Sequence, residues 1–312
     1  MDKNSIDNIP LVYYKNKSMT LKRYYHPKSI EEALYILEKE KGKAQVIAGG
    51  TDLIIDLKNN RVNIDALVDI TRIEGLNSIE LKDDFIYIGA LVTHSEIAKS
   101  TLIKKNAKVL ALATLNIGSP QVRNLGTLPG NIVNARPAAD GATALIALNA
   151  LAEIHSTNGV RWEKIEDLYL EAGKSKVNPA SEIITKIKFR FLSDNHGSSF
   201  QRLAKRKAMA LPVLNCASVV EVDKKMDRFK NVRIVVGPVA PTPFRAKRAE
   251  DLLKDAKISK EIVVQAAEIA SLDSQPRDSI RGGAIYRKDM VKVLVKRALI
   301  DSLKDVFLGR EI

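Results

Sequence analysis

The sequence contains almost no cysteine: Cys216 is the only one among 312 residues. A single cysteine excludes a disulfide within the chain. It also excludes an iron–sulfur cluster or a cysteine-based zinc site built by this chain alone. Cys216 lies in the apolar stretch LPVLNCASVV, which is typical of a buried, unreactive thiol. The sequence therefore predicts neither a metal centre nor a cysteine nucleophile.

The common signatures of nucleotide binding and hydrolysis are also missing. No GxGxxG follows an expected strand and no GxxxxGKS/T occurs, so the usual Rossmann and P-loop phosphate sites are not indicated. The four histidines show no HExxH spacing, and no GxSxG elbow is present. We predict no catalytic acid, base or nucleophile, and any bound phosphate must be held by another geometry.

No apolar run approaches the ~18 residues that a membrane-spanning helix needs. The first residues, MDKNSIDNIPLVYYKNK, contain no apolar core of the signal-peptide type. We therefore expect a cytoplasmic protein without a membrane span. Hydrophobic residues make up 45% and charged residues 28% of the chain, as in ordinary globular proteins, and the length suggests two domains.

Acidic residues are too few to balance the basic ones, and the net charge is +13. Most of the surplus follows residue 195, where 24 basic residues face 14 acidic ones. Such an excess also allows a nucleic-acid-binding protein. However, only RLAKRK at 202–207 is dense, and elsewhere the charges are mixed as on a solvated helix face. We expect no nucleic-acid partner.

The apolar patterns predict an α+β protein, with no βαβ alternation of the Rossmann kind. In the first half, strands are expected at 44–48, 66–70, 85–90 and 183–191, and helices at 30–39, 102–115 and 141–149. A hairpin is expected at 152–163, with Asn158-Gly159 as a type I′ turn. In the second half, two strands at 213–222 and 229–237 precede helices at 246–255, 260–272 and 284–303.

Two polar breaks divide the chain. Residues 1–18 have no periodic pattern and are interpreted as an arm. The stretch LSDNHGSS at 192–199 separates the two halves, and we place a domain boundary there. The predicted domains are residues 19–195 and 196–312.

Two glycine-bearing stretches are the candidate phosphate-binding elements. In QVIAGGTDLII, a strand meets Gly49 and Gly50 and continues as a helix, so backbone N–H groups at the helix start face outward. The second stretch, GTLPGNIVNARPAAD, belongs to an irregular segment at 116–140 that is too rich in glycine and proline for a long helix. Together the two loops are suited to hold the phosphates of a dinucleotide, with Asp140 accepting a hydrogen bond from a ribose. A generic strand-turn-helix connection and an ordinary packed loop are the alternatives.

Five motifs in order resemble one protein family. They are VIAGGTDLIIDLK, IGALVTHSEIA, IGSPQVRNLGTLPGNIVNARPAAD, VRIVVGPVAPTPFRAKRAEDLL and IRGGAIYRKDMVKVLVKRAL. Over about residues 20–305 the chain is similar to the FAD-binding medium subunit of molybdenum hydroxylases, which include carbon monoxide dehydrogenase and xanthine dehydrogenase. The resemblance implies a two-lobed FAD domain of the vanillyl-alcohol-oxidase/peroxidase type. A smaller domain, a three-stranded antiparallel sheet with helices, would follow it.

The resemblance also implies which residues contact FAD. The first diphosphate loop corresponds to Ala48, Gly49, Gly50, Thr51, Asp52 and Leu53. The second corresponds to Thr127, Leu128, Pro129, Gly130 and Asn131, with Asp140 contacting the adenosine or ribitol part. A side chain at Gly50 should then project into the space of the phosphates.

The chain departs from the family pattern at two places. Pro129 stands where relatives have the first glycine of Thr-x-Gly-Gly-Asn, so one N–H donor is missing. Where relatives have Tyr-x-Lys beside the isoalloxazine, this chain has Phe200 and Arg202. The positive charge that would stabilise a reduced, anionic flavin is retained, but the phenol is not. A buried core phenylalanine is the alternative interpretation of Phe200.

The function implied by the resemblance is electron transfer within a complex. A molybdopterin-containing large subunit would oxidise the substrate and a [2Fe-2S] small subunit would pass electrons to the FAD of this chain. The flavin would then reduce NAD or another acceptor. The alternative is a flavin-free structural or assembly protein of the same fold, suggested by Pro129. The basic second domain is expected to face an acidic partner subunit.

Overall fold

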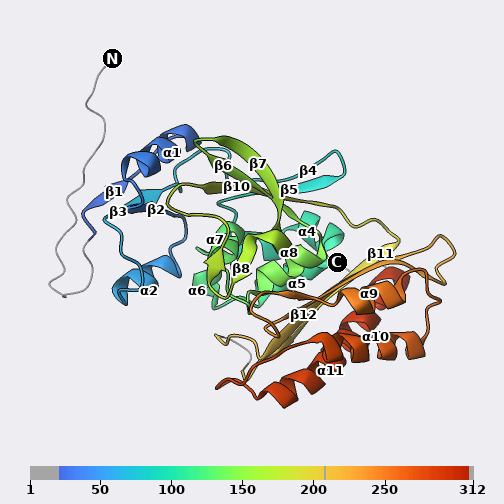
Figure 1. The fold of residues 1–312 in the computed structure, drawn as a ribbon. Coiled ribbons are helices and arrows are strands. Elements are labelled where there is room, and N and C mark those ends of the chain that lie inside the picture. Colours follow the sequence, from blue (N-terminus) through green and yellow to red (C-terminus); the bar gives the residue numbers. More distant parts are fainter. Residues whose placement is uncertain (1–20, 207–208, 309–312) are drawn as a thin grey trace.

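The computed structural model of the protein describes residues 21–206 and 209–308, and the predicted arm at 1–18 lies outside them. Three parts follow one another through the molecule (Figure 1). A small first lobe, in blue, is followed by a larger second lobe in cyan and green. The C-terminal part, from yellow to red, packs on the side of the second lobe that faces away from the first.

The first lobe is a three-stranded parallel sheet with one helix on each face. Its elements are β1 (Arg23–Tyr25), α1 (Ile30–Lys39), β2 (Ala44–Ile47), α2 (Leu53–Lys58) and β3 (Ala66–Asp69), with strand order β1-β3-β2. In the central strand, Ala66 and Val68 pack in the α1 cluster and Leu67 in the α2 cluster. The prediction that the chain contains no βαβ alternation is therefore wrong here. These strands have three or four residues, too few to show a period.

The second lobe is a five-stranded antiparallel sheet with helices packed on one face. The strand order is β4-β5-β10-β6-β7. Its strands are β4 (Ile79–Lys82), β5 (Phe85–Gly89), β6 (Leu151–Ser156), β7 (Gly159–Lys164) and β10 (Ile183–Arg190). Its helices are α3 (His94–Lys99), α4 (Thr101–Asn106), α5 (Lys108–Leu115), α6 (Pro120–Arg123), α7 (Leu128–Val133) and α8 (Asp140–Ala147). The 3-10 turn η1 (Ile165–Leu168) and the short hairpin β8 (Tyr169–Glu171) and β9 (Lys174–Ser175) connect β7 to β10.

Two local predictions need correction in this lobe. The helix expected at 102–115 is two helices, because Ala107, with φ −158° and ψ 53°, breaks the backbone between α4 and α5. The segment at 116–140 contains no long helix, as predicted, but it does include the short helices α6 and α7. The hairpin of β6 and β7 is present, but Ser156 pairs with Gly159, so its two-residue turn is Thr157-Asn158 and not Asn158-Gly159.

The C-terminal part is an antiparallel sheet with its own helices on one face and helices α5 and α8 of the second lobe on the other. Its three long strands are β11 (His196–Leu203), β12 (Leu214–Val222) and β13 (Phe229–Gly237). The residues predicted only the last two, and β11 begins inside the polar break expected at 192–199. A two-residue strand, β14 (Phe244–Arg245), adds a fourth to the three that the resemblance implied. Along β12, Ala217 and Val219 pack with the second lobe, whereas Cys216 and Val220 pack beneath the C-terminal helices. Those helices are α9 (Lys247–Leu253), α10 (Lys260–Asp273) and α11 (Ala284–Phe307).

The expected buried thiol is confirmed. Cys216 is fully buried, and burial raises the pKa of its thiol well above the ordinary range. It is therefore protonated and inert at neutral pH. Among residues 21–206 and 209–308, no group of three or more His, Cys, Asp or Glu side chains is arranged to hold a metal ion. No helix of this same part of the chain is long and apolar enough to cross a membrane.

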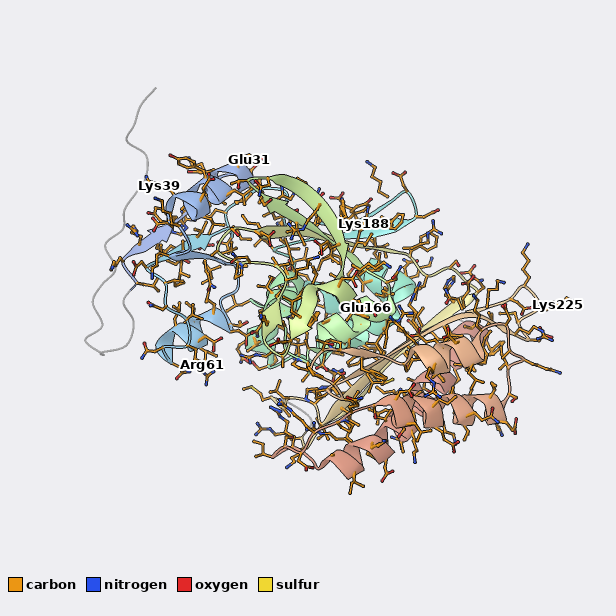
Figure 2. The ribbon with its side chains drawn as sticks, in the orientation of Figure 1. Glu31, Lys39, Arg61, Glu166, Lys188 and Lys225 are labelled. Carbon is orange, nitrogen blue, oxygen red and sulfur yellow. The ribbon has the colours of Figure 1, made fainter. Side chains whose placement is uncertain are left out.

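Ion pairs fasten the C-terminal part to the second lobe. Lys108 at the start of α5 pairs with the buried Asp305 of α11, with 2.9 Å between Nζ and Oδ1. Arg245 of β14 reaches Glu166 of η1 at 3.2 Å, and Glu166 is labelled at this junction in Figure 2. Lys188, also labelled, lies on the outer face of the second-lobe sheet, with Nζ 4.0 Å from the centre of the Trp162 ring. The sheet of the C-terminal part thus joins the second lobe through charge pairs as well as apolar packing.

Candidate functional site

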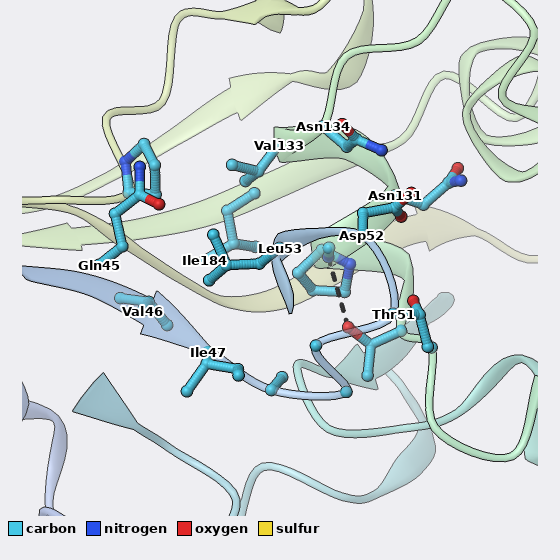
Figure 3. A pocket seen from close by; sticks show the side chains of 18 of the residues that line it. Gln45, Val46, Ile47, Thr51, Asp52, Leu53, Asn131, Val133, Asn134 and Ile184 are labelled. Atoms are coloured by element: carbon cyan, nitrogen blue, oxygen red, sulfur yellow. Dashed lines mark hydrogen bonds between the residues drawn. The ribbon is translucent and has the colours of Figure 1, made fainter. Parts of the chain in front are cut away.

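A cavity of about 460 Å³ lies where the first and second lobes meet. This volume is within the range of small-molecule and cofactor pockets. Three segments supply most of its lining: β2 with the loop to α2, α7 with the loop before it and the start of α3, and residues 173–184. Figure 3 shows Thr51, Asp52 and Leu53 on the first of these, Asn131 and Val133 near α7, and Ile184 on β10. The predicted residues on the wall are Ala48, Gly49, Gly50, Thr51, Asp52, Leu53, Thr127, Pro129, Gly130 and Asn131.

The loop from β2 to α2 presents unpaired backbone donors to this cavity. No hydrogen bond joins the N–H groups of residues 49–52 to any other residue that the structure describes. Asp52 occupies the N-cap position of α2, but its side chain makes no cap bond. The first N–H groups of a helix have no partner within the helix, and the preceding loop supplies none here. Four in succession at the start of a helix form an anion-binding surface of the kind that phosphates occupy.

Gly49 brings the two predicted loops together. A Cβ atom built on Gly49 would lie 1.9 Å from the carbonyl oxygen of Leu125, so only glycine permits this approach. The oxygen cannot retreat easily, because the next residue, Gly126, is held at both ends. Its N–H donates to Val122 and its carbonyl accepts from the N–H of His94, at 2.7 and 2.9 Å. The loop at 48–53 therefore sits directly against the segment that leads into α7.

Gly50 has a different role from the predicted one. Its φ is +65°, in the left-handed region that favours glycine. A Cβ built there would meet Ile47 Cδ1 at 3.0 Å and Ile54 Cγ1 at 3.2 Å, inside the packing of the first lobe. The expectation that a side chain at Gly50 enters the phosphate space is wrong, because the positive φ turns Cβ toward the core. Gly50 shapes the loop, and its N–H remains unpaired.

The second predicted loop forms the first turn of α7. Thr127 is the N-cap, and its hydroxyl accepts a hydrogen bond from the N–H of Gly130 at 3.3 Å. Pro129 occupies the second helical position, where a missing N–H removes no helical bond. Asn131 lines the cavity, and its Oδ1 is buried without a partner among the described residues. A Cβ on Gly130 would contact only the Thr127 hydroxyl, at 3.4 Å, so the space beside it is open.

Leu128, Asp140, Phe200 and Arg202 are not among the residues that line the cavity. Leu128 is fully buried in the main core, and Phe200, which is 7% exposed, is buried in the same core. Asp140 accepts hydrogen bonds from Asn215 at 2.6 Å and from Nε of Arg202 at 3.2 Å. Burial raises the pKa of Asp140 to about 6, although both partners oppose this shift. The structure thus places Asp140 and Arg202 in a buried polar cluster, and cofactor contacts by these four residues stay predictions.

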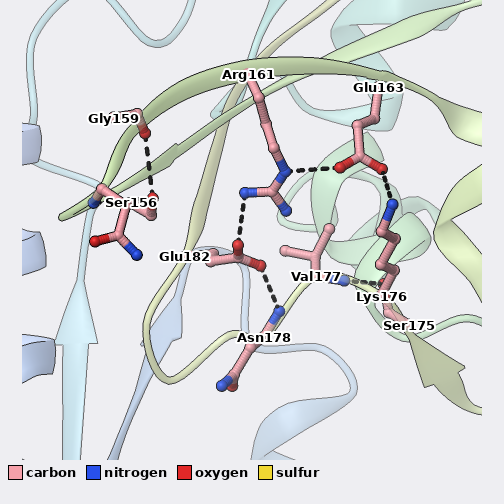
Figure 4. A network of polar contacts seen from close by, with 10 residues as sticks. Ser156, Gly159, Arg161, Glu163, Ser175, Lys176, Val177, Asn178 and Glu182 are labelled. Atoms are coloured by element: carbon pink, nitrogen blue, oxygen red, sulfur yellow. Dashed lines mark hydrogen bonds and ion pairs between the residues drawn. The ribbon is translucent and has the colours of Figure 1, made fainter.

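Sequence reasoning missed the third segment that lines the cavity, residues 173–184. Residues 173–184 reach the cavity after β8, and a network of charged side chains holds them in place (Figure 4). Arg161 of β7 bonds Glu163 at 2.7 Å and Glu182 at 2.6 Å, while Lys176 bonds Glu163 at 2.7 Å. Hydrogen bonds from Lys176 and Arg161 lower the pKa of Glu163, so its charge is kept. No periodicity or motif marks this segment, because it is positioned by partners on a separate strand.

The comparisons with known proteins show the family of this chain. Residues 17–189 match the family described as "FAD binding domain in molybdopterin dehydrogenase". The chain belongs to this family. Residues 199–302 match the "CO dehydrogenase flavoprotein C-terminal domain". The predicted family and the predicted cofactor, FAD, are thereby confirmed, and the chain is a flavoprotein subunit of the oxidoreductase class.

Relatives of this FAD-binding family match the chain over nearly its whole length. The nicotinate dehydrogenase FAD-subunit of Eubacterium barkeri is 31% identical over 284 residues, which cover 90% of this chain and 95% of the relative. The carbon monoxide dehydrogenase medium chain of Hydrogenophaga pseudoflava is 30% identical, covering 88% and 95%. A solved structure of carbon monoxide dehydrogenase from Hydrogenophaga pseudoflava superposes with a TM-score of 0.85 at 29% identity, covering 89% of this chain and 96% of that chain.

The cavity fits the diphosphate of FAD on its own geometry. The unpaired N–H groups of residues 49–52 supply donors, and the open space beside Gly130 leaves room at the second loop. Both features lie on walls of the same cavity. Phosphate oxygens only accept hydrogen bonds, so a wall of donors is the complement that they require.

Proposed function

We propose that this chain is the FAD subunit of a cytoplasmic molybdenum hydroxylase complex. In this proposal a [2Fe-2S] small subunit delivers electrons that a molybdopterin-containing large subunit has taken from the substrate. NAD or another acceptor then receives them. The observation that carries the proposal is the run of four unpaired N–H groups at residues 49–52, which line the cavity of a chain of the FAD-binding family.

Bound FAD supplies the redox chemistry, and the protein binds and orients it. The N–H groups at residues 49–52 hold the diphosphate, with Asn131 completing the contact from α7. We further propose the two-lobed vanillyl-alcohol-oxidase/peroxidase type of FAD domain for residues 19–195, followed by a separate domain at 196–312. The parallel first lobe, the antiparallel second lobe and the cavity between them support this division.

Names of relatives support the multisubunit part of the proposal. Proteins named as medium chains, medium subunits or FAD-subunits of dehydrogenases and hydroxylases cover this chain at 29–31% identity. Each name describes one component of a larger enzyme. Co-purification of this chain with a molybdopterin-containing and an iron-sulfur subunit from its own cells would test the assembly.

Gly130→Ala tests the cofactor site without threatening the fold. Alanine at a helical position is favoured over glycine by about 1 kcal/mol, and its Cβ makes only an ordinary contact with Thr127. We expect unchanged or slightly higher thermal stability and at least about tenfold weaker FAD binding, because the methyl group occupies space beside the diphosphate. Fluorescence titration of the apoprotein with FAD measures the affinity.

Gly283→Ala is the matched control for this variant. Gly283 precedes α11, is remote from the cavity, and its added Cβ would also make a single contact at 3.4 Å, with Asp278. It should bind FAD as the wild type does. If Gly130→Ala binds FAD equally well, the second loop does not hold the diphosphate. If the folded wild type binds no FAD, a flavin-free assembly protein becomes the better account.

Pro129→Gly should tighten FAD binding by several-fold to about a hundredfold. Proline at this position removes an N–H at the start of α7, and a hydrogen bond to a charged group is worth about 1.5–3 kcal/mol. Restoring the N–H adds a donor on the cavity wall, less whatever the added loop flexibility removes. Titration of wild-type and variant apoproteins with FAD measures the change. Equal or weaker binding would show that the loop is adapted to proline.

A further inference from the structure

His94 lies at the first position of α3, directly beside the loop that leads into α7. Thr93 caps α3 and forms a bridge with Thr127, the cap of α7, so the two helix starts are side by side. The N–H of His94 donates to the carbonyl of Gly126 at 2.9 Å. A Cβ built on Gly126 would lie 3.1 Å from Cδ2 and 3.4 Å from Nε2 of the imidazole. The ring is therefore held against Gly126, on the cavity wall.

The imidazole of His94 is buried but lacks hydrogen-bond partners. The residue is 3% exposed, and Nδ1 is shielded from solvent without a partner among the described residues. No residue of 21–206 or 209–308 accepts a hydrogen bond from Nε2. Leaving a buried polar group unpaired is costly, and most such groups are found paired. Nδ1 is the shielded nitrogen of this ring, so Nε2 is the one left to meet a ligand, and the described chain supplies no acceptor for it.

Electrostatics keep the ring neutral in the free protein. Burial, together with the smaller effect of the nearby Arg123, lowers the pKa of His94 to about 4. A neutral imidazole has one N–H donor and one acceptor nitrogen. An unpaired buried donor is rarer than an unpaired acceptor, which favours the proton on Nε2, the nitrogen beside Gly126, over the enclosed Nδ1. The ring thus offers one donor at the loop that leads into α7.

The rest of the wall shows which acceptor belongs there. The N–H groups of residues 49–52 are unpaired, and Gly49 packs against Leu125 next to Gly126. Donors from two segments that meet at Gly126 match a group with acceptor oxygens on several sides, as in a diphosphate. Resting on the proposed function, we propose that His94 donates a hydrogen bond from Nε2 to the diphosphate of FAD. It is a cofactor-binding residue that the two glycine-bearing loops do not include.

Substitution of His94 tests this contact by affinity. His94→Leu removes the donor with a side chain of similar size, and FAD should bind about 10- to 100-fold more weakly. His94→Gln keeps a neutral donor and should recover most of the affinity. His155→Leu, on the outer hairpin of the second lobe and not on the cavity wall, is the matched control and should bind FAD as the wild type does. ADP, which carries the diphosphate without the flavin, should show the same order of affinities.

Nitrogen-15 NMR of the histidine-labelled wild-type protein observes the hydrogen bond of the imidazole directly. This signal would not change on cofactor binding if His94 had only a structural role. On adding FAD or ADP, the Nε2 proton of His94 should become visible, shifted downfield by a hydrogen bond to phosphate. An unchanged His94 spectrum in a protein that binds FAD would overturn the proposal, even if His94→Leu failed to fold. So would wild-type affinity in a folded His94→Leu. Failure of the wild type to bind FAD would instead refute the proposed function.

Discussion

Gly49→Ala should abolish FAD binding and lower the free energy of unfolding by about 3 kcal/mol or more. The added methyl group would lie 1.9 Å from the carbonyl oxygen of Leu125 and 2.5 Å from its carbon, both backbone atoms. Hydrogen bonds on Gly126 hold that backbone in place, so the loop at 48–53 must move instead. Moving it takes the unpaired N–H groups away from the cavity. Flavin absorbance of the purified protein and its thermal unfolding measure the two effects.

Gly75→Ala is a suitable control for this prediction. Gly75 has a φ of +79° and no atom within 4 Å of an added Cβ, so alanine there adds backbone strain without a clash. It should cost about 1 kcal/mol and leave FAD binding intact. Full flavin content and an unchanged melting temperature in Gly49→Ala would contradict the close contact between the two loops.

Asp140→Ala should lower the free energy of unfolding by about 3–5 kcal/mol. Asp140 and Arg202 are an ion pair whose side chains are 5% and 9% exposed. Removing the carboxylate leaves the guanidinium buried without its counter-charge and takes the acceptor from Asn215, which is fully buried. Removing one partner of a buried ion pair costs more free energy of unfolding than the intact pair contributes, because the other charge stays buried without a partner. Chemical unfolding of the apoprotein measures the loss apart from any effect on FAD.

Asp140→Asn separates the charge from the packing. Because burial raises the pKa of Asp140 to about 6, above the ordinary value of about 3.9, the folded state binds this proton more tightly than the unfolded state. The contribution of Asp140 to stability therefore falls as the pH rises from about 4 to 6. The asparagine variant should lack this decline and lose less stability than Asp140→Ala. A wild-type-like loss of stability between these pH values in Asp140→Asn would exclude Asp140 as its source.

Local sequence signals predicted the start of both cavity loops. Two glycines after an apolar run predicted the strand-turn-helix at Gly49 and Gly50. A side chain would disfavour the positive φ of Gly50 and would block the close approach of Gly49 to Leu125. Thr93 and Glu96 form the capping box that a Thr-x-x-Glu spacing predicts. These features depend on residues within a few positions of one another, so the sequence contains the whole cause.

The sequence could not predict in the same way where a Cβ atom at each glycine would point. Gly50 was expected to leave room for phosphate, yet its Cβ direction points at Ile47 and Ile54. Gly49, one residue earlier, makes the decisive approach to Leu125. The local sequence does not determine which way each Cα–Cβ bond of a turn points. That rotation is set by what the turn packs against.

The sequence by itself determined the family, the cofactor, the buried thiol and the α+β character of most of the chain, because motifs, composition and short-range periodicity carry that information. Only the tertiary structure decided that the first lobe is parallel, that residues 173–184 form a wall of the cavity, and that Asp140 pairs with Arg202 in the interior. These features join segments tens of residues apart, and their energies arise from burial and charge pairing that exist only once the lobes have packed.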